Sequence, residues 1–238
     1  MVGAQCCENP PVLSSTCGSG WLEVIGGLNA YISGSSDSKA AVLFVSDIYG
    51  FESPNMRKLA DKVAAAGFYA VVPDFFYGDP YDSTKHASLL EWLKFHSTDK
   101  GYEDAKAVIE EIQRKGISAI GAVGICWGAK VIVESAKINE IQAAVMFHPS
   151  VVTVEDIKEV KCPISILAAE IDHVTPTEVI KQYKVALSAK PEIDSFVKIF
   201  PGLVHGWTIR YDVNDEAAVK NAEEAHTYMF DWFTKYLK

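Results

Sequence analysis

The chain has 238 residues, of which 49% are apolar and 22% charged, and this composition is typical of a folded domain with a sizeable core. It excludes intrinsically disordered and fibrous proteins. The 31 acidic residues outnumber the 22 basic ones, so the net charge is −9, which argues against nucleic acid or an anionic membrane surface as a partner.

Residues 1–20 are rich in Cys, Pro, Ser and Gly and are expected to form an irregular leader. Strand patterns follow at residues 22–33 (an antiparallel pair), 40–46, 68–73, 118–124, 141–147, 163–170 and 195–200. Helix patterns lie at residues 54–66, 89–95, 102–115, 128–137, 176–188 and 215–237. This alternation predicts one α/β domain over residues 21–238, with a mainly parallel sheet flanked by helices on both faces. Ligands of such sheets bind beyond the carboxyl ends of the strands.

The five cysteines are too irregularly spaced for a disulfide framework, and the Cys6-Cys7 pair is too isolated to form half of a zinc site. The first residues lack the basic and apolar regions of a secretory signal. No apolar run approaches the ~18 residues that a membrane span needs. We therefore expect a cytoplasmic protein.

The segment Gly124-Ile125-Cys126-Trp127-Gly128 lies between a predicted strand and a predicted helix. It has the form of the Gly-x-Ser-x-Gly nucleophile elbow, with cysteine in place of serine. Glycines are needed there because side chains flanking a strained turn would clash with the neighbouring strand and helix. The N-terminus of the following helix favours the thiolate of Cys126. The alternative is a buried structural cysteine in a glycine-rich turn.

Two further residues favour the catalytic interpretation. Asp172 comes just after the strand at 163–170, and His205 just after the strand at 195–200. The chain order of nucleophile, acid and histidine is that of the α/β-hydrolase fold. The sequence therefore predicts this fold, with Cys126 as nucleophile, His205 as base and Asp172 as the acid that orients it.

The other histidines are assigned to different environments. His173 adjoins Asp172 and is discounted as the base. His148 ends the strand at 141–147 and is interpreted as a packing or hydrogen-bonding residue. His86 and His96 lie in an irregular segment and are expected to be solvated. No group of histidine, cysteine and carboxylate residues has metal-ligand spacing, so neither a metal nor a cofactor is expected.

The strand at 40–46 is followed by Asp47, Ile48 and Tyr49. In this fold, one oxyanion donor comes from the loop after this strand and the other from the residue after the nucleophile. These donors would be the backbone N–H groups of Ile48 and Trp127, each contributing roughly 3–4 kcal/mol. Asp47 is unexpected because its carboxylate would repel a thiolate; its alternative role is to cap the following segment.

Together these residues resemble the dienelactone hydrolase family over nearly the whole chain after residue 20. The resemblance is carried by Ser-Asp-Ile-Tyr-Gly at 46–50, Val-Pro-Asp-Phe-Phe at 72–76, Gly-Ile-Cys-Trp-Gly at 124–128, Asp172, and His205-Gly206-Trp207. The chain is most similar to the plant branch, some members of which are labelled endo-1,3;1,4-β-glucanase.

The resemblance implies that Cys126 forms a thioester, that His205 acts as base and then as acid, and that Asp172 fixes the imidazole. Asp47 stands where the bacterial enzymes have a glutamate that contacts the resting thiol. Arg210 would be one of the arginines that hold a substrate carboxylate; the alternative is a surface ion pair.

The predicted function is hydrolysis of a small carboxylic ester or lactone, with no cofactor, by a monomer or weak homodimer. Aromatic residues expected around the substrate are Tyr49, Phe51, Tyr77, Tyr81, Trp127 and Trp207. One alternative is glycoside hydrolysis, which needs two carboxyl groups, for which Asp47 and Asp172 are candidates, although Asp172 is better explained as the acid that orients His205. The other is a non-catalytic binder of a small ligand on the same fold.

Overall fold

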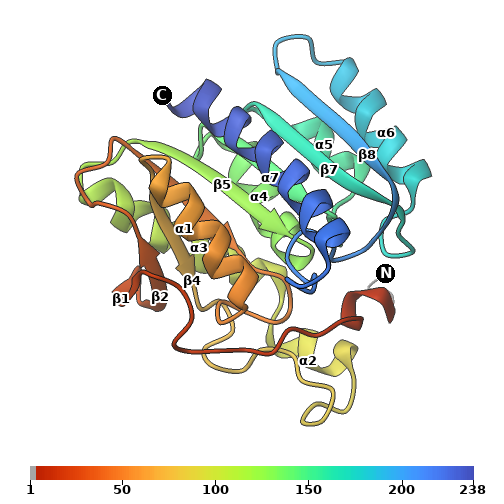
Figure 1. Ribbon diagram of the computed structural model, residues 1–238. Coiled ribbons are helices and arrows are strands. Elements are labelled where there is room, and N and C mark those ends of the chain that lie inside the picture. Colours follow the sequence, from red (N-terminus) through yellow and green to blue (C-terminus); the bar gives the residue numbers. More distant parts are fainter. Residues whose placement is uncertain (1–3) are drawn as a thin grey trace.

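Figure 1 presents the computed structural model, which describes residues 4–238. Its strands are β1 (Trp21–Ile25), β2 (Leu28–Ser33), β3 (Ala40–Val45), β4 (Tyr69–Pro73), β5 (Ala119–Ile125), β6 (Ala143–Phe147), β7 (Ile164–Ile171) and β8 (Ser195–Val204). Its helices are α1 (Pro54–Ala65), α2 (Leu89–Phe95), α3 (Thr98–Arg114), α4 (Trp127–Lys137), α5 (Val154–Glu159), α6 (Thr177–Ser188) and α7 (Glu216–Leu237), with a 3₁₀ turn, η1 (Ala4–Cys7). None of the helices in this part of the chain combines the length and apolarity needed to cross a bilayer.

The strands form one eight-stranded sheet in the order β1-β2-β4-β3-β5-β6-β7-β8. β1 and β2 pair antiparallel, β2 joins β4 antiparallel, and every later pairing is parallel. The mainly parallel sheet expected from the sequence is therefore confirmed. Because β3, β5, β6, β7 and β8 run parallel, the residues that follow them meet along one edge of the sheet.

Helices cover both faces of this sheet, and the strand residues alternate between two cores. In β3, the side chains of Leu43 and Val45 pack in the core that also contains apolar residues of α3, α4 and α6. Val42 and Phe44 pack in the opposite core, with α1 and α7. Both faces are apolar because successive side chains of a strand point to opposite sides of the sheet. Figure 1 shows α1 and α7 together in front of the strands.

Two boundaries and one helix show where the structure differs most from the predicted elements. α3 begins at Thr98 because the Ser97 side chain caps it, accepting a hydrogen bond from the Lys100 N–H at 3.2 Å. α5 was not predicted, although Thr153 and Asp156 form the capping box that starts it. β8 continues to Val204, so His205 follows the strand end directly.

Residues 4–20 are not wholly irregular, since they include the 3₁₀ turn η1. We call residues 4–12 the N-terminal strap. In Figure 1 the chain runs from η1, near the ends of β7 and β8, along the carboxyl edge of the sheet before it reaches β1. This path brings the strap next to the residues that follow the strands.

Candidate active site

Cys126 occupies a strained turn between the end of β5 and the start of α4. Its φ is 52° and its ψ is −109°, a conformation that residues with a side chain rarely adopt. A Cβ atom added to Gly124 would lie 2.4 Å from the carbonyl oxygen of Gly128, and one added to Gly128 would lie 2.2 Å from that of Val45. The two glycines are therefore required by close backbone approach, as the sequence predicted.

The structure brings Cys126, His205 and Asp172 together at the ends of β5, β8 and β7. Nδ1 of His205 lies 2.8 Å from Oδ2 of Asp172, and the ligating atoms of Cys126 and His205 are within 4.8 Å of each other. Oδ1 of Asp172 accepts hydrogen bonds from the N–H groups of Val174 at 2.8 Å and Thr175 at 3.2 Å. These bonds fix the carboxylate, which in turn leaves Nε2 of His205 free to face the thiol.

The electrostatics of this pair favour separated charges. Burial disfavours a thiolate at Cys126, but the Cys6 thiol and the His205 ring outweigh it and hold the pKa of Cys126 well below its usual value. Burial also disfavours an imidazolium at His205, yet the Cys126 thiolate and Asp172 raise the pKa of His205 to about 9. Both shifts favour a thiolate at Cys126 and an imidazolium at His205.

The backbone N–H groups predicted as oxyanion donors belong to residues that follow β3 and begin α4. Ile48 follows β3, and Trp127 is the first residue of α4. Within residues 4–238, neither N–H donates to another protein group. Trp127 belongs to the first turn of its helix, where the N–H groups have no partner inside the helix. Both donors are thus available to a bound ligand.

Asp47 and Arg210 form a buried ion pair beside the thiol. Oδ2 of Asp47 lies 2.6 Å from Nε of Arg210, and both side chains are almost fully buried. Oδ1 of Asp47 accepts from the Tyr49 N–H at 3.0 Å, so the predicted capping role is confirmed. The alternative that placed Arg210 in a surface ion pair is wrong. Burial raises the pKa of Asp47, whereas Arg210 opposes that rise and balances its charge near Cys126.

The strap places a second thiol against this site. Sγ of Cys6 lies 3.6 Å from Sγ of Cys126 and 3.9 Å from Nε2 of His205. These residues have no metal-ligand spacing along the sequence, yet the ligating atoms of Cys6, Cys126 and His205 lie within 4.8 Å of one another. Sequence reasoning missed this contact because 120 residues separate the two cysteines and no local motif links them.

Hydrogen bonds to the loops after β3 and β7 hold the strap in place. The Gln5 side chain donates to the carbonyl of Ile171 at 3.0 Å and accepts from the N–H of His173 at 2.5 Å. The Tyr49 hydroxyl donates to the carbonyl of Cys7 at 2.8 Å. Arg210 adds bonds from Nη1 to the carbonyls of Cys6 at 2.8 Å and Glu8 at 3.2 Å.

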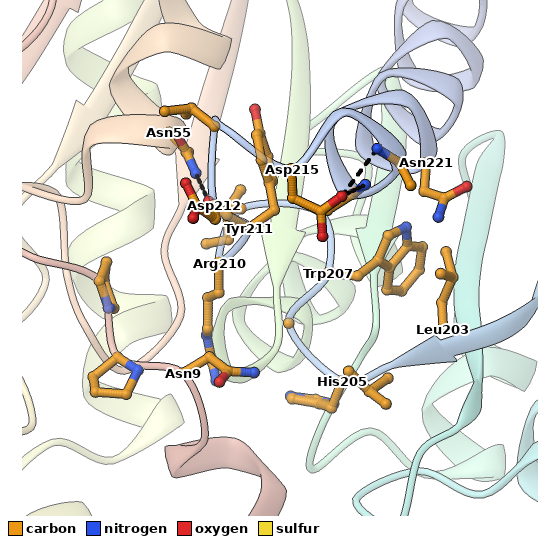
Figure 2. Close-up of a pocket in the computed structure, with 18 of the residues that line it drawn as sticks. Asn9, Asn55, Leu203, His205, Trp207, Arg210, Tyr211, Asp212, Asp215 and Asn221 are labelled. Carbon is orange, nitrogen blue, oxygen red and sulfur yellow. Dashed lines mark hydrogen bonds between the residues drawn. The ribbon is translucent and has the colours of Figure 1, made fainter.

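A cavity of about 820 Å³ opens on the other side of His205 (Figure 2). It is lined by residues 9–12 of the strap, by residues 202–207 and 209–213 at and after the end of β8, and by parts of α1 and α7. His205, Trp207 and Arg210 belong to its wall, whereas Cys126 does not. Cys126 is fully buried, and Cys6 of the strap lies against its thiol.

The predicted aromatic lining is only partly assembled around the site. Trp207 lines the cavity, and the Tyr49 ring lies 4.8 Å from the Arg210 guanidinium. Tyr77 does not join them, because its side chain is 56% exposed and its hydroxyl bonds to Asp104. The remaining three predicted residues do not line this cavity: Phe51 packs beneath the Arg57 guanidinium, Tyr81 against the ring of His86, and Trp127 against the ring of Phe76.

The histidines outside the site differ from the predictions in one respect. His148 is fully buried and its Nε2 lies 2.9 Å from the Thr208 hydroxyl, which confirms a hydrogen-bonding residue. Burial holds the pKa of His148 well below its usual value, so its ring is neutral. His86 and His96 are not solvated, because both rings are largely covered and both bind Asp79, at 3.1 and 2.9 Å.

The sheet order and the strained cysteine turn are those of the α/β-hydrolase fold. Residues 28–237 match the model of the dienelactone hydrolase family. A relative from Xenopus tropicalis, described as a carboxymethylenebutenolidase homolog, is 33% identical over 88% of each chain. The chain belongs to the dienelactone hydrolase family.

Other relatives agree with this placement. An endo-1,3;1,4-beta-D-glucanase from Zea mays is 41% identical over 80% of this chain, and the match spans 64% of that relative's length. The crystal structure of a putative dienelactone hydrolase from Klebsiella pneumoniae superimposes with a TM-score of 0.72. It covers 88% of this chain and 93% of its own at 18% identity, a level that supports the fold alone.

Proposed function

We propose that this hydrolase cleaves a small carboxylic ester or lactone through a thioester on Cys126. The observation that carries the proposal is the contact of 2.8 Å between His205 Nδ1 and Asp172, which leaves Nε2 facing the thiol at the elbow. The family and the relatives described as carboxymethylenebutenolidase homologs support an ester or lactone as the substrate. This cysteine chemistry needs no cofactor.

In the first half of the proposed reaction, the Cys126 thiolate attacks the carbonyl carbon of the substrate. The N–H groups of Ile48 and Trp127 stabilise the negative charge that develops on the carbonyl oxygen. The His205 imidazolium then gives its Nε2 proton to the departing alkoxide, which leaves as an alcohol. The products are a thioester and a neutral His205, and in a lactone the alcohol remains part of the same molecule.

In the second half, neutral His205 removes a proton from water as the water oxygen attacks the thioester carbon. The same two N–H groups hold the second oxyanion. Collapse of this intermediate expels the Cys126 thiolate and releases the carboxylic acid. His205 is again an imidazolium, so the charge-separated pair that Asp172 stabilises is restored and no external proton donor is needed.

Among the predicted substrate contacts, Trp207 and Arg210 are the best supported, because both line the cavity next to His205. Nη2 of Arg210 is buried and has no protein partner within the described residues, so it could receive a substrate carboxylate. Asp47 and Tyr49 would act on substrate through Arg210, which they contact. A cytoplasmic location and a monomeric or weakly dimeric state stay predictions.

Glycoside hydrolysis receives less support from this geometry. Asp47 is ion-paired with Arg210, and Asp172 is bound to His205. Neither carboxyl group is therefore free to act as the acid or base that flanks a glycosidic bond. A thiolate also attacks acyl carbon far more readily than an acetal.

A panel of p-nitrophenyl esters, alkyl esters, lactones and a mixed-linkage β-glucan tests the proposal. Wild type should hydrolyse members of the first three groups, and Cys126→Ala should lose this activity. Cys162→Ala is the matched control, because this thiol is buried outside the site. Glucan cleavage that survives Cys126→Ala, or ester cleavage unaffected by it, would overturn the proposed function.

A further inference from the structure

The Cys6 thiol occupies the space where the proposed reaction needs its substrate. A carbonyl carbon must come within about 3–3.5 Å of the attacking sulfur. Sγ of Cys6 already lies 3.6 Å from Sγ of Cys126 and 3.9 Å from Nε2 of His205. Both cysteines are fully buried, so the strap must open before any substrate reaches Cys126. The hydrolytic steps themselves make no use of Cys6.

We propose that Cys6 is a resolving cysteine, which forms a reversible disulfide with Cys126 after a hydroperoxide has oxidised Cys126. The disulfide fastens the strap across the site and switches hydrolysis off. It also protects the nucleophile from irreversible oxidation. The proposal depends on the two thiols and the strap, and not on the identity of the substrate.

The chemistry balances in two steps. The Cys126 thiolate attacks one oxygen of the peroxide, the O–O bond breaks, and the products are a sulfenic acid and hydroxide, or an alkoxide from an organic peroxide. The hydroxide or alkoxide from the first step takes the proton of the Cys6 thiol. The Cys6 thiolate then attacks the sulfenic sulfur, the S–O bond breaks, and hydroxide leaves as the S–S bond forms. Each peroxide takes up two electrons, one from each sulfur, and an external thiol later reverses the linkage.

Charges around the pair favour this order of events. In the resting state the hydrogen bond to the Cys126 thiolate, together with burial, raises the pKa of Cys6 far above its usual value. Cys6 is therefore the protonated partner and Cys126 the nucleophile towards peroxide. The negative charge of the Cys126 thiolate also disfavours a thiolate at Cys6. A sulfenic acid at Cys126 is neutral, so oxidation removes this repulsion. The Arg210 guanidinium, which binds the Cys6 carbonyl at 2.8 Å, then favours a thiolate at Cys6.

The position of the strap and its weak attachment allow a disulfide to form between Cys6 and Cys126. A disulfide has a sulfur–sulfur distance of about 2.05 Å, so the two atoms must approach by only about 1.5 Å. Hydrogen bonds from side chains such as Gln5 and Arg210 hold the strap, and it pairs with no strand. It can therefore open to admit a small peroxide and close again to deliver Cys6. Cys7, one residue along, is only half-buried and does not contact Cys126 within hydrogen-bonding distance.

The test compares wild type with Cys6→Ser and with Cys7→Ser as the matched control. Each full-length protein is treated with excess hydrogen peroxide in buffer that contains a chelator, so that no metal bridges the thiols. Free thiols are then blocked under denaturing conditions, and peptides are mapped without reduction. Circular dichroism and thermal melts establish that all three proteins are folded, and Cys6→Ala provides a second variant.

Wild type and Cys7→Ser should yield a peptide that joins Cys6 to Cys126 and lacks two hydrogen atoms, and dithiothreitol should reverse it. Cys6→Ser and Cys6→Ala should instead gain two or three oxygen atoms at Cys126, at least tenfold faster than wild type. Equal overoxidation in all proteins, or a disulfide that uses Cys7, would overturn the proposal. Because mapping needs no substrate, a failed hydrolysis assay would count against the proposed function alone.

Discussion

The carboxyl edge of the sheet and the N-terminal strap meet at Cys126, but they are held by different forces. At the sheet edge, Cys126 and His205 directly follow parallel strands, with Asp172 next to them, so backbone pairing fixes their positions. The strap contains one 3₁₀ turn and depends on side-chain hydrogen bonds such as those of Gln5. The sheet therefore positions the catalytic residues, whereas the strap controls the access of substrate to them.

If the residues at the sheet edge catalyse hydrolysis, His205→Ala should cause the largest loss of activity. Loss of the general acid and base should lower kcat/KM for a p-nitrophenyl ester by roughly 10²–10⁴-fold. The Cys126→Ala/His205→Ala double variant should be little worse than either single variant, because the residues act as a unit. Steady-state kinetics on folded protein measure both.

The matched control is His173→Ala, whose side chain is exposed and adjoins Asp172. It should retain wild-type kinetics. If the two single losses at Cys126 and His205 multiplied in the double variant, the two residues would be acting independently and the sheet edge would not be one catalytic unit.

The buried ion pair joins the two regions, since Arg210 binds both Asp47 and the strap carbonyls. Arg210→Ala leaves a buried carboxylate without its partner, which should reduce the free energy of unfolding by about 3–5 kcal/mol. Urea titration measures the change. Arg114→Ala is the control, because its ion pair with Glu110 is exposed and should be worth at most about 1 kcal/mol. Similar losses in both variants would contradict the role of burial.

Gln5→Ala should loosen the strap without disturbing the sheet edge. It removes two hydrogen bonds, each worth about 0.5–1.5 kcal/mol, so the open population should rise roughly tenfold. The rate at which iodoacetamide labels Cys126 should increase by the same factor, as measured by peptide mapping. Tyr77→Phe, which changes a hydroxyl bound to Asp104, should leave the rate unchanged. An unchanged rate in Gln5→Ala would mean that the strap does not control access.

The pH dependence of hydrolysis tests the role of His205 as proton donor. The pKa of His205 is raised to about 9, so the imidazolium persists through neutrality and is lost as the pH rises through about 9. Hydrolysis of an alkyl ester needs that proton for its leaving group, so kcat/KM should fall about fivefold between pH 9 and 10. A p-nitrophenyl ester has a better leaving group and should show a smaller fall. Identical profiles for the two esters would argue against His205 as the proton donor.

Some of the site could be predicted from the sequence because its signals are local. Glycines at 124 and 128 indicate a turn where backbones approach closely, and the apolar run before Cys126 indicates a buried strand. Asp172 and His205 could be placed because each follows such a run, and parallel strands bring their carboxyl ends to one edge. The missed helix α5 also had a local signal, in the capping box of Thr153 and Asp156.

The arrangement around the thiol could not be predicted in the same way. Cys6 meets Cys126 across 120 residues, and Asp47 meets Arg210 across 163. Neither pair has a spacing or periodicity that distinguishes it from the other cysteines or charges. The burial of His86 and His96 against Asp79 likewise depends on how an irregular segment packs.

The sequence by itself determined the alternation of strands and helices, the cysteine elbow, and the order in which Asp172 and His205 follow it. Backbone periodicity and glycine geometry act over a few residues, and those few residues are adjacent in the chain. Only the tertiary structure decided that Cys6 covers Cys126, that Arg210 neutralises Asp47, and that Tyr77 faces solvent. Such contacts form only when packing brings distant segments together. They are stable because the whole fold holds both segments in place, and no local pattern in the sequence encodes them.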